Sequence, residues 1–160
     1  MKKSKDSACK AIIVWQVAEV KICYLNKIPI RELPNINSSG SAEKIFRDNW
    51  SNDLELLEEF NVIFLNRANY VKGYFRLSRG GVAGTVVDPK IIFSTALKVL
   101  ASSLIIAHNH PSGCLKPSHQ DIELTKKLKQ AGQYLEIQVI DHIILSPQCG
   151  YFSFADEGLL

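Results

Sequence analysis

The sequence contains little that marks an oxidising compartment, a membrane or a highly charged partner. Its four cysteines, at positions 9, 23, 114 and 149, form no C-x-x-C pair, so neither a dithiol redox motif nor a four-cysteine zinc site is spelled out. No apolar run reaches the roughly 18–20 residues that a membrane-spanning helix needs. The net charge is only +3, from 19 Lys and Arg against 16 Asp and Glu, which is too small an excess to indicate a nucleic-acid-binding protein.

The first residues, MKKSK, resemble the basic start of a signal peptide, but the apolar segment that should follow is missing. The run Ala11–Trp15 is broken by Gln16, and the charged residues Glu19 and Lys21 follow. We therefore predict a cytoplasmic protein without a membrane segment, whose cysteines are free thiols.

The composition is that of a folded globular chain. Hydrophobic residues make up 46% and charged residues 22% of the 160 positions, which excludes a disordered or collagen-like chain. This length suits one domain. We predict a strand-like N-terminal extension and loop over residues 1–37 and a single domain over residues 38–160.

Alternating strand and helix patterns predict a mixed β-sheet flanked by helices, of the α/β or α+β class. Asp88 and Pro89 are typical of a helix N-cap and first helical position. Extended segments are expected over 10–25, 58–65, 70–77, 104–107, 137–145 and 151–154, with a hairpin between the second and third of them. Helices are expected over 41–52 and 89–101 and from residue 118 onward.

A candidate metal site lies where the short apolar strand 104–107 runs into polar sequence. His108 and His110 are separated by one residue, so on an extended chain both imidazoles point to the same side and can share one metal ion. Asp121 lies in the first turn of the helix that Ser118 opens, where the helix dipole favours an ionised carboxylate. Two imidazoles and one carboxylate are typical of a catalytic zinc site with a fourth position open to water.

Each of these residues also has a purely structural interpretation. Ser118 and Asp121 are spaced like an N-cap and its third helical residue, a pair worth about 1 kcal/mol of helix stability without any chemistry. His142, in an apolar strand, is expected to lie in the core or behind the metal ligands.

The letters His-Asn-His also occur in a nuclease motif, but there they are spread over a longer unit. The H-x-E and P-C-x-x-C signatures of zinc deaminases are absent.

The combined pattern, His108-x-His110, seven residues, Ser118, two residues, Asp121, resembles the signature of the JAMM (JAB/MPN) metalloprotease family. The segments HNHPSG, PSHQDIELTKKL, VIDHIIL and EEFNVIFLNRANYVKG are similar to its RadC-like branch, and the resemblance extends over roughly residues 40–155. It implies the JAB/MPN fold, a cytidine-deaminase-like architecture.

The resemblance also implies roles for individual residues. His108, His110 and Asp121 would bind Zn²⁺, and Ser118 would hydrogen-bond the reacting water or the oxyanion. Glu58 would be the general acid/base, because it precedes the aromatic Phe60 by two residues as the glutamate does in RadC-like sequences. Glu59 remains an alternative, since neighbouring strand residues face opposite sides and the apolar pattern does not say which side faces the metal.

The function implied is zinc-dependent hydrolysis of an amide, peptide or isopeptide bond in a protein or peptide substrate, with ubiquitin-like conjugates as one candidate. The alternative is a non-enzymatic module of the same fold that binds a protein or DNA, with a role in DNA repair or in mobile elements. The loop after HNHPSG departs from the family pattern, because Cys114-Leu115-Lys116 stand where an acidic residue and a proline are more common.

Overall fold

The computed structural model describes residues 13–14, 17–18, 24, 26–81, 85–148 and 150–160. Its centre is a five-stranded sheet with the order β4-β3-β5-β6-β7. These strands are β3 (Glu59–Leu65), β4 (Val71–Arg79), β5 (Ser103–Asn109), β6 (Gln138–Leu145) and β7 (Tyr151–Ser153). β5 and β6 run parallel and the other neighbours antiparallel. The mixed sheet confirms the predicted fold class.

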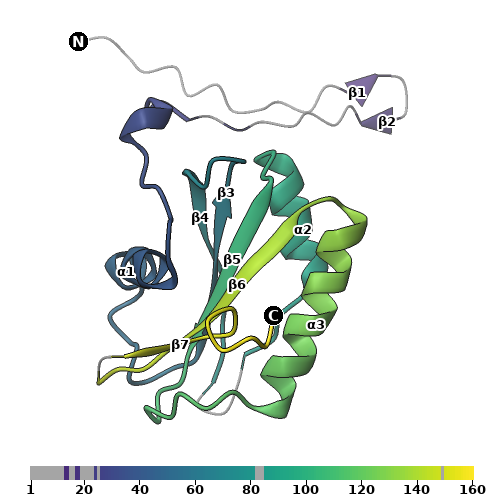
Figure 1. The fold of residues 1–160 in the computed structure, drawn as a ribbon. Helices are drawn as coiled ribbons and strands as arrows, with labels where there is room; N and C mark the ends of the chain where they lie inside the picture. Colours follow the sequence, from purple (N-terminus) through teal and green to yellow (C-terminus); the bar gives the residue numbers. More distant parts are fainter. Residues whose placement is uncertain (1–12, 15–16, 19–23, 25, 82–84, 149) are drawn as a thin grey trace, which may run out of the picture.

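Helices cover both faces of the sheet, so the central strands β3 and β5 are buried along their whole length. α1 (Ser39–Asn49) lies on one face, and α2 (Pro89–Lys98) and α3 (His119–Tyr134) lie on the other (Figure 1). Because successive strand residues point to opposite faces, Ile105 of β5 packs in the core under α1 and Ile106 packs in the core under α2 and α3. We call these the α1 face and the α3 face.

The predicted hairpin is present, and its turn residue Asn66 explains the tight connection. The Asn66 side-chain oxygen accepts hydrogen bonds from the backbone N–H groups of Ala68 and Tyr70, at 2.9 and 3.0 Å. Such local side-chain bonds are why asparagine favours turns. β3 then pairs with β4, from Glu59 against Arg79 to Leu65 against Val71.

Several element boundaries differ from prediction by a few residues, among them the end of α1 at Asn49 and that of β4 at Arg79. Three of the differences have a clear local reason. α1 begins at Ser39 rather than Ser41, because the Ser38 hydroxyl accepts the Ser41 N–H in a capping box. α2 ends at Lys98 rather than near residue 101, since Leu100 takes a left-handed φ of 51° that no helix continues through. β5 runs on to Asn109, because its polar end still pairs with β6.

The N-terminal segment predicted to be extended, residues 10–25, lies largely outside the described residues. Within it, β1 (Ile13–Val14) and β2 (Val17–Ala18) pair as a separate antiparallel ribbon. A short 3-10 helix, η1 (Ile30–Glu32), precedes α1. The division at residue 37 stays a prediction. None of the helices in the described part of the chain is long and apolar enough to cross a membrane.

Candidate metal centre

The end of β5 carries the two histidines. His108 is the next-to-last residue of the strand and is buried, and His110 follows the strand and is partly buried. Asp121 is the third residue of α3, and its side chain is 13% exposed. Because α3 returns along the same face of the sheet, its first turn meets the end of β5 in the lower part of Figure 1.

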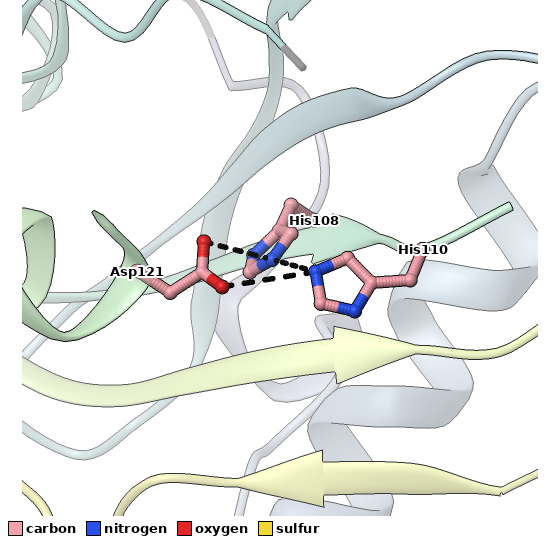
Figure 2. A group of neighbouring side chains, drawn as sticks. All are labelled: His108, His110 and Asp121. Atoms are coloured by element: carbon pink, nitrogen blue, oxygen red, sulfur yellow. Dashed lines mark hydrogen bonds and ion pairs between the residues drawn. The ribbon is translucent and has the colours of Figure 1, made fainter. Parts of the chain in front are cut away.

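The three side chains converge on one another (Figure 2). His108 Nε2 lies 3.0 Å from His110 Nε2 and 3.3 Å from Asp121 Oδ1, and His110 Nε2 lies 3.7 Å from Asp121 Oδ2. Zinc bonds of 2.0–2.1 Å in a tetrahedron would separate neighbouring ligand atoms by about 3.3 Å. These residues therefore have the spacing of three corners of such a site, and the fourth corner is left for another ligand.

The neighbours of His110 determine which of its nitrogens faces the site. His110 Nδ1 lies 2.6 Å from the backbone carbonyl oxygen of Cys114. A carbonyl oxygen only accepts hydrogen bonds, so Nδ1 carries the proton in the neutral ring. The lone pair of the neutral ring is then on Nε2, which faces His108 and Asp121.

A chain of buried hydrogen bonds determines the same tautomer for His108. The Thr125 hydroxyl donates to the Asp121 carbonyl oxygen at 2.6 Å, so its oxygen accepts from His142 Nδ1 at 2.6 Å. His142 Nε2 is then the acceptor for His108 Nδ1–H at 2.8 Å. Complete burial lowers the pKa of His142 well below its usual value, as this neutral chain requires. The His108 lone pair is therefore also on Nε2.

The charge of the site is set by Asp121. Burial by itself raises the pKa of the Asp121 carboxyl, but hydrogen bonds with His108 and His110 outweigh it and hold the pKa well below its usual range. The hydrogen bond with Asp121 is in turn the main cause that raises the pKa of His110. A carboxylate facing two nitrogen lone pairs is repulsive unless a cation lies between them, either a proton or a metal ion.

Ser118 holds Asp121 in place. Its hydroxyl donates to Asp121 Oδ2 at 2.6 Å and accepts the Asp121 N–H at 3.1 Å, while the Ser118 N–H donates to the same Oδ2 at 2.7 Å. This is the capping box that the spacing suggested. The hydroxyl proton is thus directed at the carboxylate of Asp121, and a contact of Ser118 with a reacting group stays a prediction.

Glu58 and Glu59 lie on opposite faces of the sheet. Phe60 pairs with His108 across β3 and β5, so the alternation puts Glu58 on the α3 face with the histidines. The Glu58 charge is close enough to contribute to the raised pKa of His110, after the larger effect of Asp121. Glu59 is buried on the α1 face, where its carboxylate accepts from Ser51 and lies 3.5 Å from Arg79 Nε.

Comparison with known proteins identifies the family. A family model described as a RadC-like JAB domain matches residues 36–159. The chain belongs to the RadC-like JAB domain family. A UPF0758 protein of Flavobacterium johnsoniae is 48% identical over 102 residues, which are 64% of this chain and 44% of that protein. A UPF0758 protein of Porphyromonas gingivalis is 39% identical over 153 residues, 94% of this chain and 65% of that protein. The chain thus spans about half to two thirds of the length of these relatives.

The sequence did not indicate two buried polar residues of this RadC-like JAB domain that lie next to the triad, Thr125 and Asn109. Thr125 lies four residues after Asp121, so the helix period places it on the same side of α3, and that spacing is the signal that was available. Asn109 lies between the two histidines, and strand alternation alone would have placed it on the α1 face. Figure 2 shows the triad, in which Thr125 supports His108 through His142.

Proposed function

We propose that the protein is a zinc-dependent hydrolase of the JAMM type that cleaves an amide, peptide or isopeptide bond. The observation that carries the proposal is the convergence of His108, His110 and Asp121, with both imidazole Nε2 lone pairs directed at the same point as the carboxylate. Two nitrogens and one carboxylate, with one corner open, are the ligand set of many hydrolytic zinc enzymes. Adaptor modules need no such complete set.

His108 Nε2, His110 Nε2 and an oxygen of Asp121 would hold the ion. When bound, zinc supplies Lewis acidity, which polarises a substrate carbonyl and makes a nearby water acidic enough to react near neutral pH. Glu58, on the same face, would take a proton from the attacking water at its carboxylate and deliver it to the leaving nitrogen. Ser118 would keep the carboxylate of Asp121 aligned, and its hydroxyl would have to rotate away from that carboxylate to hydrogen-bond the developing oxyanion.

The substrate class we propose is a protein or peptide, with ubiquitin-like conjugates among the first to test. An amide or isopeptide bond presents a carbonyl for attack and an amine to receive the proton, which are the two groups that this arrangement of residues addresses. The predicted cytoplasmic location agrees with such substrates and with the exposed free thiol of Cys114.

The experiment that tests the proposal compares protein with and without metal. The chain is purified, its zinc content measured, and one half stripped with a chelator, then reloaded. We expect about one zinc per chain and cleavage of at least one member of a panel of peptide and isopeptide conjugates, lost on stripping and restored by zinc. Zinc-loaded protein that cleaves nothing on the panel would favour the non-enzymatic module that binds protein or DNA.

A further inference from the structure

The residue between the two histidines points away from them. Asn109 is the last residue of β5, and its side chain lies on the α1 face while the imidazole of His108 lies on the α3 face. It is completely buried. A buried amide must find partners, and those of Asn109 lie in the segment that leads into β3.

Asn109 makes three hydrogen bonds, all to the backbone of that segment. Its Oδ1 accepts the Glu59 N–H at 2.8 Å. Its Nδ2 donates to the carbonyl oxygens of Leu54 and Leu57, at 2.7 and 2.9 Å. Both N–H donors of the amide are therefore used, and the orientation of the amide is unambiguous, because carbonyl oxygens accept and backbone N–H groups donate.

Two of these bonds lie on either side of Glu58. The Leu57 carbonyl belongs to the peptide group before Glu58, and the Glu59 N–H belongs to the peptide group after it. The carbonyl of that second peptide, Glu58 O, also accepts the Gly80 N–H at 2.8 Å. The two peptide planes set the φ and ψ of Glu58, and hence the direction of its side chain.

We propose that Asn109 is a positioning residue, which holds Glu58 on the α3 face, next to the metal ligands. This inference rests on the proposed function, in which Glu58 transfers a proton. In the tripeptide His108-Asn109-His110, the two histidines would then provide metal ligands on one face of the strand. Asn109 would fix the backbone of the base, Glu58, from the other face. A displacement of the base by about 1 Å is enough to cost roughly 10²-fold in rate.

The test replaces Asn109 with leucine and uses Asn61→Leu as the matched control. Asn61 is also completely buried on the α1 face, in the neighbouring strand β3, but its amide makes no hydrogen bond to the backbone around Glu58. We expect Asn109→Leu to retain zinc and to lose about 10²-fold in kcat with little change in KM. We expect Asn61→Leu to keep both zinc and kcat.

A double-mutant cycle distinguishes positioning from a general loss of structure. If Asn109 acts through Glu58, Asn109→Leu has no further effect on kcat in a Glu58→Gln background. An additive loss in the double variant, or an unchanged kcat in the zinc-loaded single variant, would overturn the proposal. Should the leucine variant fail to fold, Asn109→Ala replaces it, because the smaller side chain leaves room for water at the three backbone groups.

The role of Asn109 can also be tested by structural measurements that do not depend on hydrolytic activity. Amide hydrogen exchange at Glu59 should become faster in Asn109→Ala than in Asn61→Leu, and a zinc-loaded crystal structure should show the Glu58 carboxylate turned away from His110. If the wild type proves inactive, the proposed function fails, and this readout still decides the role of Asn109. An unmoved Glu58 with unchanged exchange at Glu59 would refute it.

Discussion

The polar side chains at the end of β5 differ in their hydrogen-bond partners between the two faces of the sheet. On the α1 face, Asn109 and Glu59 are bonded to other parts of the protein, the first to backbone and the second to Ser51 and Arg79. On the α3 face, His108 and His110 are held from behind, and their Nε2 atoms are left facing Asp121.

This difference has a simple physical basis. A buried polar group needs a partner, and a group without one costs free energy. The α1 face supplies every partner of Asn109 from the protein and so fixes a backbone segment. The α3 face fixes the orientation of both imidazoles and leaves their Nε2 atoms free of partners other than one another and Asp121, as a proposed cation site requires. Substitutions on the two faces should therefore differ in what they change, zinc binding or the geometry of the backbone.

Removing a ligand should have the largest effect. His110→Ala deletes one corner of the triad, so we expect zinc and hydrolysis to be lost together, with a fall in affinity larger than the roughly 10–100-fold typical of changes behind a ligand. The control is His119→Ala, since His119 is the first residue of α3 and its side chain is exposed. Metal analysis by mass spectrometry gives the readout, and full zinc content in His110→Ala would exclude His110 as a ligand.

Replacing each of the two glutamates in turn should show which face of the sheet carries the general base. Glu58→Gln removes the proton acceptor but no ligand, so we expect a normal zinc content and a kcat lower by about 10²–10⁴-fold. Glu59→Gln changes a side chain on the α1 face and should keep kcat within a few-fold. The measurement is kcat per bound zinc on the cleaved conjugate, and the opposite ranking would assign the base to Glu59.

Breaking the hydrogen-bond chain behind His108 should have a smaller effect. Thr125→Val removes the acceptor of His142 Nδ1–H, so the ring of His108 loses its fixed tautomer, and we expect a zinc affinity lower by about 10–100-fold. Thr95→Val is the control, because the Thr95 hydroxyl also bonds a carbonyl one helical turn earlier, Ile91 O at 2.8 Å. Competition with a chromogenic chelator measures the affinity; equal values in both variants would contradict a role for the chain.

Removing a cap should have the smallest effect. Ser118→Ala and Ser38→Ala each break a capping box, so each should lower the free energy of unfolding by about 1 kcal/mol in urea denaturation. Of these two hydroxyls, only that of Ser118 also bonds the carboxylate of Asp121, a proposed metal ligand. We therefore expect a lower zinc affinity for Ser118→Ala alone. Identical zinc affinity in both variants would mean that Ser118 caps the helix and does not contribute to zinc binding.

Much of the fold could be predicted because its signals are local. The hairpin follows from two strand patterns around Asn66, and the start of α2 follows from Asp88 and Pro89. The end of β5 was missed because His108 and Asn109 are polar, and polar residues usually mark a loop. They pair with Ile144 and Leu145 of β6, which are 36 positions further along the chain, and no local pattern contains such a partner.

The candidate site divides in the same way. The spacing of residues singled out His108, His110 and Asp121. In the structure, each imidazole Nε2 atom lies within 3.7 Å of the other and of an oxygen of the Asp121 carboxylate. Spacing did not distinguish Glu58 from Glu59, because both sides of the segment EEFNVIFL are apolar. The register of Phe60 against His108 assigns each glutamate to a face, and register is a relation between two strands.

The order of residues by itself indicated the mixed sheet and the candidate ligands, since alternation, helix period and capping act over a few neighbouring positions, and its resemblance to RadC-like sequences indicated the family. Only the tertiary structure decided which nitrogen of each imidazole faces inward, which glutamate shares their side of the sheet, and what anchors it. Those outcomes depend on carbonyls, hydroxyls and strand partners that meet only when distant segments pack together, because hydrogen bonds require contact in space and not proximity along the chain.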